Sequence, residues 1–487
     1  MTIAKPTNEL GRRRFLTGTA CALPLTYLNR AHAAGPVAPA PPPTPRPADN
    51  PLSGIAPHKV VQSYKSRHLA DLSDRHLCAA ATRIVAEPDE NPSSFTLHAP
   101  LELMARFSLL PLVRPADREM ARMQIVASVA AYQEEAKPTP LPTAHAPFPD
   151  LATAEREMAA AHKAADSARL EAMTLQLARQ AGNAAVVRIL TPVALPSLGA
   201  AAHAHIGLWL LLRHGGSGGD AQAAALLRNA VRMVASEPGA RLKSFSGMDL
   251  RIAKPARGSV DVAGEILTKL ATAPDIGKEE THGIRGLMEA AERSGVADRL
   301  FGELMRTHLV DDDIDAGFRA IAKVAAHIML QSDNLDAHRM TQPQAAFGLS
   351  HYHPARKLAL GSALVWITGY RAEGDKSRLD FDFQPPPAPP GMGLREALEA
   401  APEVAASRFW WSAPEEAGQA YELLATEAAV RGKQHFVKYT RACFDMAALH
   451  PPDERLYLAA AAHKASKEIR NTPRSKLTES LSGKRSG

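Results

Sequence analysis

The spacing of apolar residues is the feature that most constrains the fold of this chain. From His58 onward, apolar residues recur at the three- and four-residue spacing of α-helices almost throughout. Runs of Val, Ile and Thr that alternate with polar residues, as strands require, are scarce. Some stretches, such as residues 200–212, are apolar on nearly every face, which is typical of core helices in a large bundle. The sequence therefore predicts an all-α fold, a large multi-helix bundle in one or two lobes.

The expected helices are bounded by residues that favour helix ends. Pro115 and Pro414 stand where first-turn prolines belong, and Gly215 with Gly216 ends a helix. The clearest helical stretches are residues 60–86, 101–112, 116–135, 151–180, 198–213, 221–234, 284–294, 313–330, 356–371 and 415–448.

The N-terminus has the pattern of a twin-arginine export signal. Residues 11–16 are Gly-Arg-Arg-Arg-Phe-Leu, followed by a modestly apolar stretch. The small residues Ala-His-Ala at 31–33 predict cleavage after them. We therefore expect residues 1–33 to be a signal peptide and the protein to be periplasmic or secreted, exported folded by the twin-arginine machinery. The apolar stretch is short and broken by Pro24, so no stable membrane span is expected.

Three further segments follow this signal peptide. Residues 34–55 are Pro-rich and predict an extended linker, residues 56–465 a helical domain, and residues 466–487 a basic, disordered tail. The whole chain has a net charge of +6, but this excess lies at its two ends: residues 34–463 have a net charge of about −3. No basic face remains in the core, so the composition does not indicate nucleic-acid binding.

Two short motifs have the wrong context for the sites that they resemble. Residues 216–221 fit a dinucleotide-binding fingerprint, but a helix rather than a strand is expected before them. Residues 311–315 are acidic like a calcium loop, but Ala316 and Ala322 replace the required glycine and glutamate. We interpret the first as a connecting loop and the second as a helix start.

Cys78 and Cys443 are the two cysteines that remain after the expected cleavage. They could form a disulfide bond in an oxidising compartment. A single pair is no disulfide framework, and a chain of this length can bury a large core without one.

Histidines occur at four separate places among apolar or small residues. His98 opens an apolar helix, and His203 lies with His205 in an alanine-rich helix. His351 and His353 precede a proline and the next expected helix. Any one of these is most simply a hydrogen-bonded core residue. Their recurrence in such surroundings indicates a shared site for metal binding or acid–base chemistry.

The fourth place adds a lysine. His435 and Lys438 lie three residues apart, on one face of an expected helix and beside an apolar stripe. A lysine in that position would be partly desolvated, which lowers its pKa and makes its amine available for chemistry.

These stretches resemble the questin oxidase-like family. The resemblance lies in Leu-His-Ala-Pro at 97–100, Ala-Ala-His-Ala-His-Ile at 201–206, His-Phe-Val-Lys-Tyr-Thr-Arg-Ala at 435–442 and Tyr-Leu-Ala-Ala-Ala at 457–461. It implies an all-α enzyme that uses O2, whose fungal relatives open anthraquinone-type rings, a reaction often described as an NADPH-linked Baeyer–Villiger oxidation.

The alternative picture of the family's centre is a non-haem iron held by several histidines and a carboxylated lysine. Carried over to this chain, the resemblance implies His435 and Lys438 as catalytic residues and leaves the third histidine open between His351 and His353. The iron ligands that it implies are His98, His203, His351, His435 and Lys438.

Three functions follow from these observations. The first is an exported iron-dependent oxygenase that acts with O2 on an aromatic or polycyclic substrate. The second is a periplasmic helical binding or scaffold protein without catalysis. The third places the histidines as acid–base groups beside NADPH, and it ranks below the first because the sequence contains no recognisable nicotinamide-binding motif.

Overall fold

The computed structural model describes most of the chain between residues 50 and 474. The described residues are 50–195, 199–214, 220–235, 314–331, 337–351, eight positions between 356 and 367, and 383–474. The expected signal peptide, the helix at 284–294, the loop at 216–219 and His353 lie outside them, as does the tail beyond 474.

The prediction of an all-α fold is confirmed. The part of the chain that the structure describes contains α-helices, short 3-10 helices and one isolated β-bridge, between Asp89 and Pro138, but no sheet. The α-helices are α3 (Val60–Ser66), α4 (Asp74–Val85), α5 (Ser94–Leu109), α6 (Arg118–Glu135), α7 (Leu151–Lys163), α8 (Ser167–Ala194), α9 (Gly199–His214), α10 (Asp220–Ala235), α14 (Ile314–Gln331), α15 (His338–Ser350), α17 (Leu394–Glu399), α18 (Pro402–Trp410), α19 (Ala417–Ala429), α20 (Gln434–Leu449) and α21 (Glu454–Asn471).

Capping side chains explain where the helices differ from the expected ranges. The stretch expected at 151–180 is two helices, because Ala165 adopts a left-handed φ of 58° and Asp166 then caps α8 by accepting the Arg169 N–H at 3.0 Å. Helix α5 begins earlier than expected because Ser93 and Thr96 form a reciprocal capping box.

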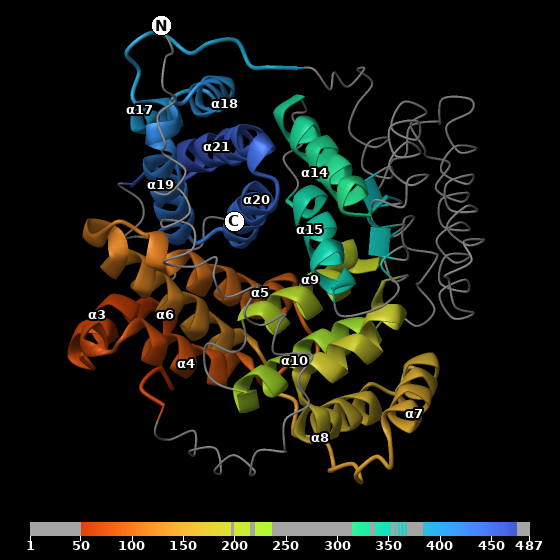
Figure 1. Cartoon of the computed structure of the whole chain (residues 1–487). Coiled ribbons are helices and arrows are strands. Elements are labelled where there is room, and N and C mark those ends of the chain that lie inside the picture. Colours follow the sequence, from red (N-terminus) through yellow and green to blue (C-terminus); the bar gives the residue numbers. More distant parts are fainter. Residues whose placement is uncertain are drawn as a thin grey trace, which may run out of the picture.

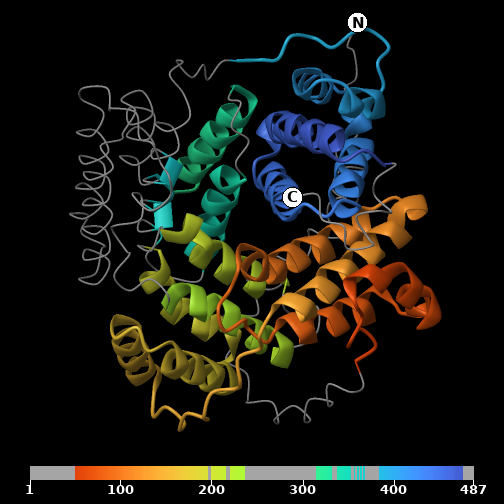
Figure 2. The ribbon, with the colours of Figure 1, turned by 180° about the vertical axis from the view of Figure 1, so that it is seen from behind.

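The helices enclose two apolar cores that lie against each other. One core is built mainly from α3 to α10 and the other mainly from α14 to α21. In Figure 1 the first group, coloured red to yellow-green, lies below, and the second group, green to blue, lies above. Figure 2 shows the same division from behind. Helix α5 joins them, since Leu101 belongs to the first core and Ala105 to the second.

The folded part is wider than the domain expected at 56–465. Leu52 and Ile55, in the segment expected to be a linker, are buried in the first core, and α21 continues to Asn471. Cys78 and Cys443 are both buried free thiols, so the disulfide bond that the sequence allowed is not formed. Among the described helices, none combines the length and apolarity that crossing a membrane requires.

Close packing of α9 against α15 gives a test of the fold. A Cβ atom added at Gly348 would lie 2.4 Å from the Trp209 indole ring. We expect Gly348→Ala to lower the free energy of unfolding by about 1–3 kcal/mol, because the ring is held between two helices. The measurement is chemical denaturation followed by circular dichroism.

Gly432→Ala is the matched control for this substitution. Its added Cβ would meet only the Gln124 side chain, at an ordinary 3.6 Å. We expect a change within about 0.5 kcal/mol. Equal stability of the two variants would contradict the α9–α15 packing.

Candidate metal centre

Four helices near the middle of the molecule form a closed ring around one point. Helix α5 packs on α9 and α20, and α15 also packs on α9 and α20 (Figure 1). Each of the four helices carries one histidine that faces the others. These residues are His98 on α5, His203 on α9, His338 on α15 and His435 on α20. The interior of such a ring of helices is where bundles build metal and cofactor sites.

The four imidazoles follow one another around a square. Neighbouring ring centroids lie 4.4 Å apart for His98–His203, 4.9 Å for His203–His338, 4.8 Å for His338–His435 and 4.6 Å for His435–His98. The diagonal from His98 to His338 is 6.2 Å. His98, His203 and His338 are buried, and His435 is half-buried.

The nitrogen atoms of this square have the spacing of metal ligands. The Nε2 atom of His203 lies 2.8 Å from Nε2 of His98 and 3.2 Å from Nε2 of His338. One nitrogen from each of His98, His338 and His435 lies within 4.8 Å of the others. Metal–imidazole bonds of about 2.0–2.1 Å at right angles place neighbouring nitrogens about 3 Å apart. His98, His338 and His435 therefore fit a single metal ion, and His203, which is not part of this group, lies within hydrogen-bond distance of His98 and His338.

Hydrogen bonding selects the tautomer of His98 that a metal requires. Its Nδ1 atom contacts the carbonyl oxygen of Ser94, one turn earlier on α5. A carbonyl oxygen can only accept, so Nδ1 carries the proton and donates it. In the neutral ring the lone pair is then on Nε2, the atom that faces His203. A backbone carbonyl in this role is typical of metal-binding histidines.

Backbone strain precedes His203. Ala202 has a left-handed φ of 55°, which costs about 1–2 kcal/mol for a residue other than glycine.

His205, two residues beyond His203, has a different role. Its Nε2 donates to Ala194 O at 2.7 Å, and its Nδ1 accepts from Gln342 Nε2 at 2.9 Å, which ties α9 to α15. Burial lowers the pKa of His205 to about 4, so this ring is neutral.

Long-range hydrogen bonds fix the backbone at His338 and the backbone that leads to His435. The Trp366 indole N–H donates to the backbone oxygen of His338 at 3.0 Å. Arg106 donates to the carbonyl oxygens of Ala429 and Arg431, in the chain that leads from α19 into α20 and His435. Arg106 is itself held by Glu102, at 2.7 Å between Nε and Oε1.

No carboxylate belongs to the group of metal-ligating side chains found among the described residues. Glu102, one turn after His98, is buried and engaged by Arg106 and by the Ser128 hydroxyl at 3.1 Å. Lys438 lies three residues after His435 on α20 and is only 1% exposed. Arg339, next to His338, is 0% exposed. Two buried cationic residues, Lys438 and Arg339, and one buried acidic residue, Glu102, are therefore near the histidines along the chain.

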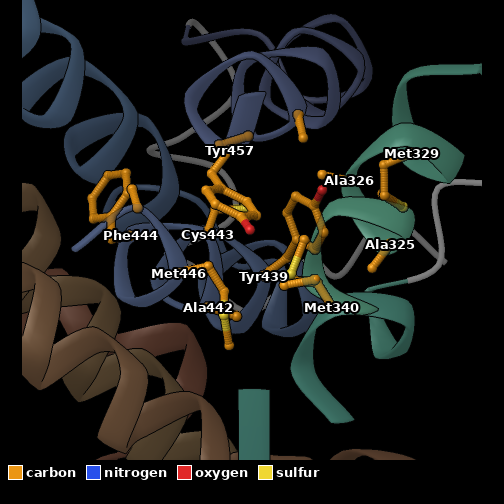
Figure 3. Close-up of a cluster of buried hydrophobic side chains, with 14 of the residues drawn as sticks. Ala325, Ala326, Met329, Met340, Tyr439, Ala442, Cys443, Phe444, Met446 and Tyr457 are labelled. Carbon is orange, nitrogen blue, oxygen red and sulfur yellow. The ribbon is translucent and has the colours of Figure 1, made fainter. Parts of the chain in front are cut away.

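A buried apolar cluster lies between α14, α15, α20 and α21 (Figure 3). It includes Tyr439, Cys443 and Met340, with Ala326 of α14 and Tyr457 of α21 around them. Burial raises the pKa of both tyrosines well above its usual value and that of Cys443 to about 12. These groups therefore stay protonated at neutral pH.

The structure brings together three of the four histidines expected as ligands. His98, His203 and His435 belong to the square, and Lys438 lies on the His435 side of α20. His351 does not join them. It follows the last residue of α15, about 20 Å along the helix from His338, and its exposed ring packs on Phe347 with centroids 4.8 Å apart.

His338, which was not expected from the sequence, takes the place expected for His351. The surroundings of His338 are less rich in alanine than those of His203, and the polar neighbours Arg339, Gln342 and Gln344 do not indicate a buried helix start. The position of His338 at the start of its helix is the signal that could have identified it. His98, His203, His338 and His435 are all within the first five residues of their helices.

Comparison with known proteins identifies no relative. No family model matches the chain, and neither a curated protein nor a solved structure is significantly similar to it.

The geometry predicts metal binding that depends on His338 and not on His351. We expect the protein to bind one divalent metal ion per chain and His338→Ala to lower the affinity at least tenfold, because one of three imidazole donors is lost. Metal analysis after equilibrium dialysis against a competing chelator measures this.

His351→Ala is the matched control, since that ring lies at the far end of the same helix. Its affinity should equal that of the wild type. The assignment fails if the His351 variant loses metal or if the His338 variant keeps it.

Proposed function

We propose that the protein is a mononuclear non-haem iron oxygenase that acts with O2 on an aromatic or polycyclic substrate. The observation that carries the proposal is the square of four imidazoles with Nε2 atoms 2.8 and 3.2 Å apart. The resemblance of residues 97–100, 201–206 and 435–442 to the questin oxidase-like family supports the same chemistry.

Iron is the metal that agrees with both the imidazole donors and the family resemblance. Imidazole ligands suit zinc, copper, nickel and iron alike, so the donor set alone does not choose among them. The resemblance favours iron. A twin-arginine signal is also consistent with a metal inserted in the cytoplasm before the folded protein is exported.

Lys438 would supply the one negatively charged ligand. A buried ammonium group near a divalent cation is unfavourable, so the amine is expected to be neutral. A neutral amine adds CO2 and releases one proton to form a carbamate, which presents carboxylate oxygens to the metal. The i, i+3 spacing to His435 puts the two side chains on one face of α20.

The chain's own residues would hold the metal and exclude water. His98, His338 and His435 would hold the metal, with His203 beside them, and the carbamate of Lys438 would supply a carboxylate oxygen. Bound iron would supply the O2 activation that amino acid side chains lack. The apolar cluster of Figure 3 excludes bulk water next to this centre, which protects reactive species from hydrolysis.

The alternatives have less support. A scaffold without catalysis leaves the convergence of four imidazoles unexplained. No observation supports the interpretation with NADPH, because the described residues contain no strand–helix–strand unit of the dinucleotide-binding kind.

The proposal predicts a specific role for Lys438. We expect Fe(II)-loaded protein to consume O2 in the presence of hydroxylated naphthoquinones or anthraquinones. Lys438→Ala should lower this rate at least 100-fold, because the anionic ligand is lost, and added short carboxylates such as acetate should restore part of it. An oxygen electrode measures the rate.

Lys433→Ala is the control, because Lys433 is a half-buried residue at the start of the same helix. It should keep the wild-type rate. An unchanged rate in Lys438→Ala, or no oxygen consumption by iron-loaded protein with any of these quinones, would contradict the proposal.

A further inference from the structure

We infer that the loop between α19 and α20 sets the position of His435 at the metal centre, and that Arg106, a buried arginine on α5, is the positioning residue of this loop. The inference rests on the metal centre of the proposed function and deepens it, since it identifies how the scaffold controls one ligand. It is carried by hydrogen bonds that reach the loop from α5, from α6 and from the segment that follows α21.

Three successive backbone carbonyl groups at the end of α19 accept hydrogen bonds from side chains. Carbonyls at a helix C-terminus have no partner within their own helix. Arg106 donates from its two terminal nitrogens to Ala429 O and Arg431 O. Gln124 of α6 donates from Nε2 to Val430 O at 3.0 Å. Side chains of α5 and α6 therefore fix the course of the chain between α19 and α20.

Arg106 links this loop to the helix that carries His98. His98, Glu102 and Arg106 lie at four-residue intervals on α5, so they share one face of that helix. The guanidinium is held in turn by Glu102, whose Oε1 accepts from Arg106 Nε at 2.7 Å. His435 follows Arg431 by four residues, and its ring centroid lies 4.6 Å from that of His98. The spacing between the two imidazoles therefore depends on Arg106.

The side chain of Arg431 ties the same loop to the segment that follows α21. Arg431 is 0% exposed, and its Nε donates to Thr472 O at 3.2 Å. Its Nη1 donates to Glu427, one turn earlier on α19, and Glu427 also accepts from Arg474. These contacts do not involve Arg106. When Arg106 is replaced, the loop is therefore expected to shift rather than to unfold.

An arginine suits this task better than a lysine. The planar guanidinium holds two acceptors at once in a fixed geometry, whereas the lysine ammonium is a single point charge on a flexible stem. A lysine at position 106 keeps the positive charge opposite Glu102 but cannot bridge the carbonyls of Ala429 and Arg431. Tight metal binding requires ligands held within about 0.5 Å of their bonding positions, so a small shift of the loop is enough to weaken it.

Binding of Co(II) tests the role of Arg106. Co(II) binds imidazole ligands, and its visible absorption bands depend on the number and geometry of the ligands. We expect Arg106→Lys to lower the Co(II) affinity at least tenfold and to change these bands, because His435 is displaced. Equilibrium dialysis measures the affinity and absorption spectroscopy the bands.

Arg122→Lys is the matched control. Arg122 is also a buried arginine, and it donates to the Asp74 carboxylate and to the carbonyl oxygens of Leu69 and Leu72. None of these residues lies on α5, α9, α15 or α20. We expect this variant to lose stability to chemical denaturation like Arg106→Lys, but to keep the Co(II) affinity and spectrum of the wild type. Equal losses of affinity in the two variants would overturn the inference.

A second pair of variants decides the inference even if Arg106→Lys does not fold. Gln124 and Gln133 both lie on α6, and each donates to a backbone carbonyl at 3.0 Å, that of Val430 and that of Leu52 respectively. Gln124→Met should lower the Co(II) affinity at least threefold, whereas Gln133→Met should leave it unchanged. The same affinity in both variants would contradict a role for the loop.

A double-mutant cycle shows whether Arg106 acts through His435. In a chain that already carries His435→Ala, we expect Arg106→Lys to have no further effect on the Co(II) affinity. Effects that add would mean that Arg106 acts independently of His435, and this outcome would overturn the inference.

The outcomes separate this inference from the proposed function. A wild-type chain that binds no Co(II) refutes the metal centre, and the proposed function fails with it. If the wild type binds Co(II) and Arg106→Lys binds it equally well with the same spectrum, the inference is overturned and the metal centre stands.

Discussion

The packing of α5, α9, α15 and α20 into a closed ring is the constraint on which the site depends. Each helix brings one imidazole to a common point, and each is locked by contacts that have nothing to do with a metal. Arg106 fixes the chain before α20, Trp366 fixes the start of α15, and His205 ties α9 to α15 through Gln342. The ligand geometry is therefore a property of the scaffold, which is the condition for tight and selective metal binding.

The helical pattern predicted the fold well because the 3.6-residue period is a local property of the sequence. His98, His203 and His435 could also be predicted, since each stands among small or apolar residues. That His338 rather than His351 lies beside the other three histidines could not be predicted in the same way. Both flank a single helix, α15, and which end of it meets the other three helices is decided by tertiary packing. The break at Ala165 depended likewise on a left-handed residue that composition does not reveal.

Hydrogen-bond contacts link three of the four imidazoles to one another. The Nε2 atom of His203 has two other Nε2 atoms within 3.2 Å, and the tautomer of His98 directs a lone pair towards it. A bound metal ion would take the place of these contacts by accepting the nitrogen lone pairs. The left-handed backbone at Ala202, next to His203, is also strained. Strained backbone persists where the surrounding structure holds it and is often associated with function.

The square also lies at the boundary between the two apolar cores. Helices α5 and α9 belong mainly to one core, and α15 and α20 mainly to the other. An ion held by these histidines would therefore link the two halves of the molecule. The metal-free chain would then be less compact than the metal-bound chain.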